Sequence, residues 1–455
     1  MRSQKPRPTA KTIFAIFMMF LLVSVVVPTQ SQARKFKAHA NTAPQGASRS
    51  SGDSSATPGP WKQLAKLTES KGKEQDWLGW SVAISKDGNT AAVSAVGWCP
   101  LKNSDGCGQG AIFVFVKPAS GWADMTETAM LTASDGQPGE YLGESVAISD
   151  DGSTVVGGAP KWPADDTGKG ALYVFVKPRT GWVDGTESAR LNATDTGTNL
   201  GQSVAMSGRT IVGGAEYFNG FQGAAYVFVE PRTGWANMTQ MARLTPSDGK
   251  GGFMGDSVSV TADTVVAGAP ITGAGGAGNG AYVFVKPKSG WKDRTEAAKL
   301  TASHGTGFEL GYSVSISAGT VAVGARLRSH NNGAVYVYVQ PTHGWRSMTE
   351  TARLTVQPKF NLLGYSVSIN SNGKDIFGGA PGWQLGQGAV DLFRKPSSGW
   401  KTTSRFAARL TASDGIAQDG LGFSVSGSPL AVVGGAPYAQ IGSNPQQGAA
   451  YLFVQ

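Results

Sequence analysis

The chain has 455 residues, more than one ordinary compact core holds, so we expect several domains or a repeat architecture. Its 63 glycines and its low share of charged residues, 16%, are typical of an all-β protein with many turns. The formal net charge is +9, but residues 61–455 carry only +2 of it. That nearly neutral body argues against a phosphate-binding surface and predicts no nucleic-acid partner.

The N-terminal 33 residues are typical of a secretory signal peptide. A basic stretch precedes the 15-residue apolar run from Ile13 to Val27, and a small-residue cleavage site ends at Ala33. The run is shorter than the ~20 residues that span a bilayer, so we expect cleavage and export, with an uncleaved membrane anchor as the alternative. Residues 34–60 are rich in Ser, Ala, Thr, Gly and Pro and predict a disordered linker.

Residues 61–455 contain one pattern seven times. A Leu-Gly or Met-Gly pair followed by x-Ser-Val recurs at steps of 53 to 64 residues, with its glycine at Gly79, Gly143, Gly201, Gly255, Gly311, Gly364 and Gly422. A Gly-Ala pair before an apolar strand, as in GALYVFV, begins at Gly110, Gly170, Gly223, Gly280, Gly333, Gly388 and Gly448. A segment such as TVVGGAP lies between these motifs, and KPxxGW and an A-x-L-T segment follow them. Such self-similarity predicts repeated supersecondary units.

Each unit contains four short β runs and no helical periodicity. In GALYVFV, one face holds Leu172, Val174 and Val176 and the other holds Tyr173 and Phe175, so the strand is expected to be buried on both sides. Glycine, serine and alanine fill the runs before it, which suits strands crowded around an axis. Seven such units predict an all-β, seven-bladed β-propeller of four-stranded blades. A β-solenoid is the competing repeat fold, but its periods are shorter and its strands are parallel.

The two ends of the repeat region are complementary. The segment Trp61–Thr68 copies the fourth run of a unit, whereas the chain stops at Gln455, just after the third run of the last unit. We therefore expect the N-terminal strand to complete the last blade and close the ring. This pairing would also cover a strand edge that otherwise invites aggregation.

These motifs resemble the FG-GAP repeat, which is found in integrin α-subunit propellers and in exported bacterial proteins. Leu-Gly or Met-Gly stands at the FG position, and GAP itself begins at Gly158, Gly268, Gly379 and Gly435. The resemblance covers residues 61–455 and implies a propeller that binds ligands on one face. It does not name a ligand, because the family spans adhesion, enzyme-associated and unassigned proteins.

Integrin-type repeats that bind calcium carry D-x-D-x-D-G-x-x-D between the first and second strands. The matching segments here, such as SDDGST, lack those alternating oxygen ligands, so we interpret Asp150 and Asp151 as turn residues. We expect no metal and no cofactor. Type I′ hairpin turns are predicted at Asp87-Gly88, Asp151-Gly152 and Asn372-Gly373.

Two further residue types bear on chemistry. Cys99 and Cys107 are the only cysteines and predict a local disulfide in an exported protein, with a two-thiolate metal site less supported because no histidine or third cysteine lies near. The four histidines fall in no nucleophile or metal-ligand motif, so we expect no enzymatic activity. A propeller can still gather distant carboxylates at its axis, which keeps a carbohydrate-active enzyme as an alternative.

Aromatic residues gather in the variable loops between second and third strands. Because equivalent loops of all blades emerge on one face, we expect an incomplete ring of exposed aromatics that binds a ligand. The candidate ligand-binding residues are Trp98, Trp162, Tyr217, Phe218, Phe221, Trp383 and Tyr438. Alternatively, these side chains fold back and plug the loops. The tryptophans after KPxxG are interpreted as packing between blades: Trp122, Trp182, Trp235, Trp291, Trp345 and Trp400.

The sequence thus predicts an exported, non-enzymatic and monomeric binding or adhesion module. We expect it to be secreted or at the cell surface, with an extracellular protein or a carbohydrate as its ligand. Membrane contact is expected only through an uncleaved signal segment. The alternatives are a carbohydrate-active propeller enzyme and a purely structural surface protein.

Overall fold

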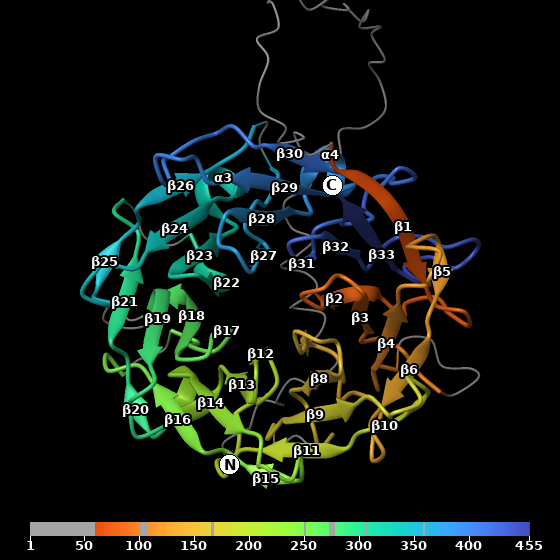
Figure 1. The fold of residues 1–455 in the computed structure, drawn as a ribbon, viewed down its shortest axis with the longest axis horizontal. Helices are drawn as coiled ribbons and strands as arrows, with labels where there is room; N and C mark the ends of the chain where they lie inside the picture. The colour runs from red at the N-terminus through yellow and green to blue at the C-terminus, as the bar shows by residue number, and fades with distance from the viewer. Residues whose placement is uncertain are drawn as a thin grey trace, which may run out of the picture. The chain divides into compact units, whose positions relative to one another are not determined.

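The computed structural model describes residues 60–100, 107–164, 168–249, 252–272, 278–304, 308–357 and 360–455. The predicted signal peptide, and all but the last residue of the linker predicted over residues 34–60, fall outside the described residues. The described residues form seven β-sheets set as blades around an axis (Figure 1), which confirms the all-β, seven-bladed propeller. Helical turns in this part of the chain are short: α2 (Phe218–Phe221), α3 (Arg328–Asn331) and α4 (Trp383–Gly386).

Each blade is an antiparallel sheet whose strands run in chain order from the axis to the rim. Blade 1 consists of β2 (Leu78–Ile84), β3 (Thr90–Ala95), β4 (Ala111–Val116) and β6 (Ala129–Thr132). Blade 2 consists of β7 (Val146–Ile148), β8 (Thr154–Ala159), β9 (Ala171–Val176) and β11 (Ala189–Asn192). Blade 3 consists of β12 (Ser203–Ser207), β13 (Thr210–Ala215), β14 (Ala224–Val229) and β16 (Ala242–Thr245).

The remaining blades follow the same order. Blade 4 consists of β17 (Ser257–Val260), β18 (Thr264–Thr272), β19 (Gly278–Val285) and β21 (Ala298–Thr301). Blade 5 consists of β22 (Leu310–Ser317), β23 (Thr320–Ala325), β24 (Val335–Val339) and β26 (Ala352–Leu354). Blade 6 consists of β27 (Val367–Ile369), β28 (Asp375–Ala380), β29 (Ala389–Arg394) and β30 (Ala408–Leu410). Blade 7 begins with β31 (Ser424–Gly427), β32 (Ala431–Ala436) and β33 (Ala449–Val454).

The N-terminal strand closes the ring, as predicted. β1 (Lys62–Thr68) pairs antiparallel with β33, with Lys62 opposite Val454 and Leu67 opposite Ala450. Figure 1 shows this orange strand lying along the rim side of the blue β33. Blade 7 is therefore made from both ends of the propeller.

A further strand at the rim was not predicted from the sequence. The chain that leads into an outer strand first adds two residues, in parallel, to the outer strand of the preceding blade. These short strands link neighbouring blades by backbone hydrogen bonds. They are β5 (Met125–Thr126), β10 (Gly185–Thr186), β15 (Met238–Thr239), β20 (Arg294–Thr295) and β25 (Met348–Thr349).

The hydrophobic core lies between the blades. Each of the seven apolar clusters in the described residues combines side chains from two neighbouring blades; one joins Phe113 of blade 1 to Leu452 of blade 7. Third strands are buried on both faces, as expected. Val176 is the exception within β9, because it ends the strand beyond the core and is 42% exposed.

Small residues near the axis let neighbouring blades approach closely. A Cβ atom added at Gly268 would lie 2.0 Å from the Gly311 carbonyl oxygen of the next blade. Beside it, the Ser257 hydroxyl donates to that same oxygen at 2.8 Å. The equivalent bond from Ser424 to the Gly79 carbonyl, at 2.9 Å, joins blade 7 to blade 1. The x-Ser-Val and Gly-Gly-Ala motifs are therefore inter-blade contacts.

Asp150 and Asp151 lie in a tight hairpin turn. The Gly152 N–H donates to the Ser149 carbonyl at 2.9 Å, and the Asp151 carboxylate accepts from the Ser149 hydroxyl at 2.7 Å and the Ser153 N–H at 3.0 Å. The predicted type I′ geometry is wrong. A type I′ turn needs positive φ at both central residues, whereas here only the glycine is left-handed, at 67°.

The KPxxG tryptophans are structural, as interpreted. Five of the six are buried and Trp235 is half-buried against the cluster between blades 2 and 3. The Trp122 and Trp182 indole N–H groups donate to the carbonyl oxygens of Gly88 and Gly152, at 2.9 and 3.1 Å. These two indoles thus support the inner hairpins of blades 1 and 2.

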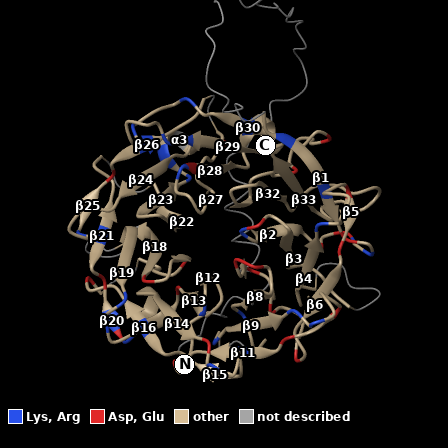
Figure 2. Cartoon of the chain, viewed as in Figure 1, with Lys and Arg blue, Asp and Glu red and all other residues tan. Residues whose placement is uncertain are grey.

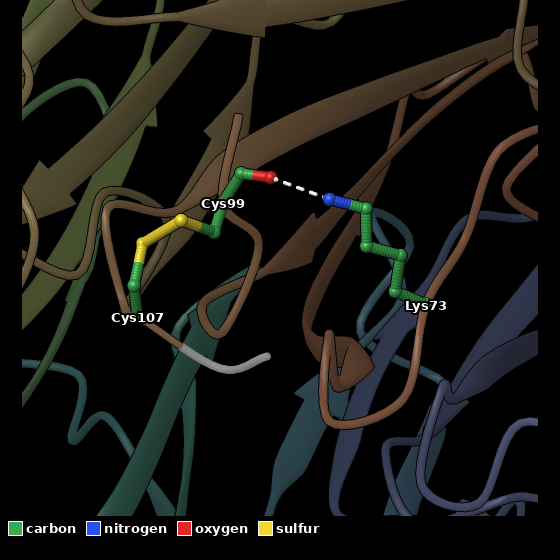
Figure 3. The surroundings of a disulfide bond; sticks show 3 residues. All are labelled: Lys73, Cys99 and Cys107. Atoms are coloured by element: carbon green, nitrogen blue, oxygen red, sulfur yellow. Dashed lines mark hydrogen bonds between the residues drawn. A yellow bond between two sulfur atoms is a disulfide. The ribbon is translucent and has the colours of Figure 1, made fainter. Parts of the chain in front are cut away.

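The predicted disulfide joins Cys99 to Cys107 in the loop after β3. The Lys73 ammonium group donates to the Cys99 carbonyl oxygen at 3.2 Å (Figure 3), which ties this loop to the segment that leads into β2. Cys99 is therefore held by both the disulfide and Lys73. Figure 2 shows both charge signs scattered around the ring, in keeping with the near-neutral charge of residues 61–455.

Candidate functional site

One face of the propeller carries both the loops between second and third strands and the segments that enter the inner strands. Inner strands begin where second strands end, as Leu310 opposite Ala325 shows in blade 5. We call this side the loop face. The hairpin turns and the KPxxGW segments lie at the other end of the strands.

Four of the seven predicted aromatics fold back onto the blades. Trp98 packs against the core cluster between blades 7 and 1. The Trp162 indole N–H donates to Asp135 at 3.1 Å, with the Arg190 guanidinium stacked 4.4 Å from the ring centroid. Phe218 and Trp383 meet arginines in the same way, Arg243 at 5.0 Å and Arg409 at 5.1 Å. The expected ring of exposed aromatics is therefore not formed.

Polar contacts that recur between neighbouring blades explain why these rings turn inward. In blade 3 the Tyr226 hydroxyl donates to Asp195 at 2.8 Å, and Arg243 pairs with the same carboxylate at 3.1 Å. Tyr282, Asp248 and Lys299 repeat the arrangement in the next blade. Phe218 covers the blade 3 group, so its role here is to shield an ion pair from water.

Two predicted residues, Tyr217 and Phe221, belong to a partly exposed aromatic cluster with Phe253. The Tyr217 ring lies 5.2 Å from Phe221 and 6.1 Å from Phe253, and the Phe221 and Phe253 centroids are 5.0 Å apart. Phe221 is 47% exposed and is the most accessible of the seven predicted aromatics. The cluster sits on the loop face between blades 3 and 4.

Tyr438, the last predicted aromatic, points to a site that sequence reasoning missed. Its ring contacts Phe423 at 5.8 Å, at the start of the inner strand of blade 7. Phe423 is the x residue of the x-Ser-Val motif. The seven x residues surround the axis at the loop face, and we call them the axial ring: Trp80, Glu144, Gln202, Asp256, Tyr312, Tyr365 and Phe423.

Half of the axial ring is an aromatic arc. Trp80 and Phe423 have their centroids 4.8 Å apart, Phe423 and Tyr365 are again 4.8 Å apart, and Tyr365 and Tyr312 are 5.1 Å apart. Trp77 extends the arc outward, 6.0 Å from Trp80. Four consecutive blades thus present touching ring faces and edges.

The other half of the ring is polar and consists of Glu144, Gln202 and Asp256, with Glu216 beside Asp256; we call these four residues the polar arc. Burial raises the pKa of Glu144 to about 7, although the Trp80 indole N–H within hydrogen-bonding reach opposes that shift. Burial raises the pKa of Glu216 also to about 7, and its carboxyl group is within hydrogen-bonding reach of Asp256. Burial, then repulsion from Glu216, raise the pKa of Asp256 well above its ordinary value. At neutral pH this arc therefore holds protons that ordinary carboxylates have lost.

Arg326 stands where the two arcs meet. Its guanidinium lies 3.8 Å from the Tyr312 ring centroid and 5.2 Å from that of Tyr365, and it pairs with Glu309 at 2.6 Å. Burial raises the pKa of Tyr312 to about 12. A fixed cation thus separates the phenol rings from the acidic groups.

The residue three positions before the motif's x residue is backbone-strained in six blades. Trp77, Tyr141, Asn199, Phe253, Glu309 and Leu362 have φ between 54° and 58°, a region that costs an L-residue about 1–2 kcal/mol. In blade 7 the equivalent residue is Gly420, which takes the same left-handed conformation, with φ of 76°. Because it is glycine, this backbone has no steric cost there. The left-handed conformation thus belongs to the repeat, whereas the side chain that it carries changes with each blade.

A sequence signal for the axial ring existed. Within each Leu-Gly-x-Ser-Val motif, every position but x is nearly constant, whereas x changes from Trp to Glu, Gln, Asp, Tyr and Phe. Positions needed for packing repeat, so a position that varies inside a repeating motif is free of that need. Sequence alone did not show that the seven x residues meet at one axis.

The arrangement sets limits on the chemistry of the axial ring. Paired carboxyls in glycoside hydrolases stand about 5–9.5 Å apart to leave room for the sugar or a water molecule. Glu216 and Asp256 are within hydrogen-bonding reach of each other, which is too close for that spacing. Across the described ranges, no three His, Cys, Asp or Glu side chains are grouped to hold a metal ion.

Seven blades with one variable position at the axis define a β-propeller of the binding or structural kind. The sequence profile of the FG-GAP repeat matches residues 61–115, 125–175, 238–284, 294–338 and 405–453, more than half of the chain. The chain therefore belongs to the FG-GAP repeat family. Each match runs from an outer strand to the third strand of the next blade, and the first match begins with β1, the outer strand of blade 7. No curated protein matches the chain.

The FG-GAP propeller and the disulfide are features of extracellular proteins. No helix in the part of the chain that the structure describes has the length and apolar character to cross a membrane.

Proposed function

We propose that the protein is an exported, non-enzymatic binding module that holds its ligand at the axial ring on the loop face. One observation carries the proposal: the single variable position of the repeat sorts into an aromatic arc and a polar arc around one axis. Packing alone gives no reason for that sorting. The strained aromatics Trp77 and Phe253 beside the ring add support, because glycine would hold the same backbone at lower cost.

The ligand is a carbohydrate or a polar segment of an extracellular protein. Aromatic faces stack on the C–H face of a sugar ring and on partner side chains. Protonated carboxyl groups and the Gln202 amide both donate and accept hydrogen bonds, which suits hydroxyl groups. Tyr217 and Phe221 lie beside the polar arc and extend the contact surface toward blades 3 and 4.

The test is a glycan and matrix-protein array probed with the full-length chain. Glu144→Leu is close in size to glutamate but can neither donate nor accept a hydrogen bond. We expect its binding to fall at least about tenfold, the effect of losing one charged or strong hydrogen bond. Asp150→Leu, in an exposed turn on the opposite face, is the matched control and should bind normally. Equal binding by both variants would place the ligand elsewhere.

A further inference from the structure

A tetrapeptide from the next blade covers the rim of most blades. At blade 3, the first residue, Asp293, accepts a hydrogen bond from the backbone N–H of Arg243 at 2.7 Å. The next two residues pair in parallel with the outer strand, and the fourth, Glu296, accepts from the Ser247 N–H at 2.8 Å. The five tetrapeptides share Thr in third place: Asp124–Glu127, Asp184–Glu187, Asn237–Gln240, Asp293–Glu296 and Ser347–Glu350.

The first of these contacts recurs at six of the seven outer strands. The backbone N–H groups of Lys66, Met130, Arg190, Arg243, Lys299 and Arg353 all donate to an incoming side-chain oxygen, at 2.7–3.1 Å. The acceptor is Asp in three cases and Asn, Ser or Thr in the others. The contacts within the propeller thus show that a short side chain with an oxygen acceptor fits opposite this backbone N–H.

Blade 6 is the exception, because the ring closes there. The following blade uses β1 as its outer strand, and β1 stays on β33 from Lys62 onward instead of crossing to β30. Gln63 still takes the fourth place of the tetrapeptide and accepts from the Ser413 N–H at 2.8 Å. Three residues earlier stands Pro60, which has no side-chain acceptor. Within the described residues, no strand covers the outer edge of β30 and nothing accepts from the Arg409 N–H.

The uncovered edge borders a hollow with a basic rim. Pro60, Leu392, Arg394 and Ala408 line the hollow beside Arg409. A second hollow shares Arg394 and is lined by Lys401 and Arg405. Arg394 and Arg409 are held by Asp375 and Asp391, at 2.8 and 2.6 Å, whereas the exposed Lys401 and Arg405 pair with no acid among the described residues. Figure 2 shows basic residues at the start of β1, next to β30.

We propose that the outer edge of β30, with the basic hollow beside it, binds an extended, aspartate-bearing segment of a partner protein. The segment lies parallel to β30, and its aspartate accepts from the Arg409 N–H as Asp293 accepts from Arg243. Pairing with an open strand edge supplies the backbone hydrogen bonds of β-augmentation, and the basic rim favours the carboxylate. The site is separate from the axial ring, so it stands or falls independently of the ligand proposed there.

The test uses the full-length chain and a terminally blocked peptide with the sequence of residues 123–130, ADMTETAM. We expect saturable binding by fluorescence anisotropy and slower amide hydrogen exchange in the fragment that contains Arg409. The same peptide with Asp124→Ala should bind about tenfold more weakly, since it loses a charge-assisted hydrogen bond. Absence of saturable binding, or binding without slower exchange at Arg409, would overturn the proposal.

A substitution in the chain tests the geometry directly. Pro60→Asp supplies the missing acceptor from within, so we expect peptide binding to weaken about tenfold or more while the Tm rises. Pro178→Asp, exposed on blade 2, adds the same charge elsewhere and should change neither quantity. Wild-type affinity in a folded Pro60→Asp protein would contradict the proposal. Lys401→Glu with Arg405→Glu gives a second test, with the same expected loss of affinity.

Discussion

Between neighbouring blades the same contacts recur around the ring, whereas at the axial ring the side chain changes with each blade. Gly268 and Ser257 meet the Gly311 carbonyl just as their counterparts meet the next blade elsewhere. Next to these contacts on the same inner strands, Asp256 and Tyr312 occupy the equivalent x position of the motif but differ in charge, size and chemistry. The recurring contacts hold the propeller together, and the changing ones are available for recognition.

The largest effect should follow from disturbing a recurring contact. In Gly268→Ala the new Cβ would lie 2.0 Å from the Gly311 carbonyl oxygen, which belongs to the backbone of the next blade and cannot move away easily. We expect the free energy of unfolding to fall by more than about 3 kcal/mol, measured by chemical denaturation.

Gly234→Ala is the matched control for that substitution. Gly234 has φ of 95° but no atom within 4 Å of a new Cβ, so only backbone strain is added, at a cost of about 1 kcal/mol. If the two variants lose the same stability, close approach of the blades is not what selects glycine at position 268.

The recurring contacts were also the part of the molecule that the sequence predicted well. Seven repeats in register, each with four strand-like runs, predict the propeller. A first strand that precedes the first repeat predicts the closure of the ring, because the last repeat lacks its outer strand. The type I′ turns were misjudged because Asp-Gly occurs both in those turns and in turns where only the glycine is left-handed. The two-residue rim strands escaped notice because so short a segment has no periodicity to read.

The candidate site was predicted far less completely. Loop aromatics were expected to face solvent, but an aromatic side chain next to a partly buried arginine gains more by covering it, as Trp162 covers Arg190. Tyr438 was correctly placed near the loop face, yet its partners Phe423 and Tyr365 come from other blades. Contacts across the axis depend on the closed ring, which no single repeat contains.

The polar arc should make stability depend on pH. Glu216 and Glu144 have a folded-state pKa of about 7, above the ~4.3 of an unfolded glutamate. The folded protein therefore binds more protons than the unfolded chain between about pH 4.5 and 7, so its free energy of unfolding falls as pH rises through that window. Above pH 7 the effect levels off. Because solvent partly reaches these groups, we expect a loss of about 2 kcal/mol.

Glu216→Gln isolates the pH effect. The amide keeps a hydrogen bond to Asp256 but does not titrate, so the difference in Tm between pH 5 and pH 8 should shrink. Glu74→Gln, a half-buried glutamate in the segment before β2, should leave that difference unchanged. An undiminished pH dependence in Glu216→Gln would mean that the acidic arc is not its source.

A smaller effect should appear at the strained aromatic Phe253, whose φ is 57°. Compared with Phe253→Ala, the Phe253→Gly protein should be more stable by about 1 kcal/mol, because glycine adopts this backbone without steric cost. In an ordinary exposed strand or helix the order would be the reverse. Thermal unfolding of the two variants decides the question, and a more stable alanine variant would show that the backbone is not strained there.

The smallest effect separates two adjacent aspartates at the far end of the strands. Hydrogen bonds from the Ser149 and Ser153 hydroxyls lower the pKa of Asp151 to about 2, so its contribution to stability is present above about pH 4 and is lost as pH falls toward 2. Asp151→Ala should cost about 1 kcal/mol at pH 7, as loss of a turn-stabilising acceptor does. Asp150 is exposed and makes only a 3.8 Å ion pair with Lys86, so Asp150→Ala should change stability by less than about 0.5 kcal/mol.

Added calcium gives an independent check of the turn interpretation: a rise of several degrees in the Tm of the unmodified protein, absent in Asp151→Ala, would identify the pair as metal ligands instead.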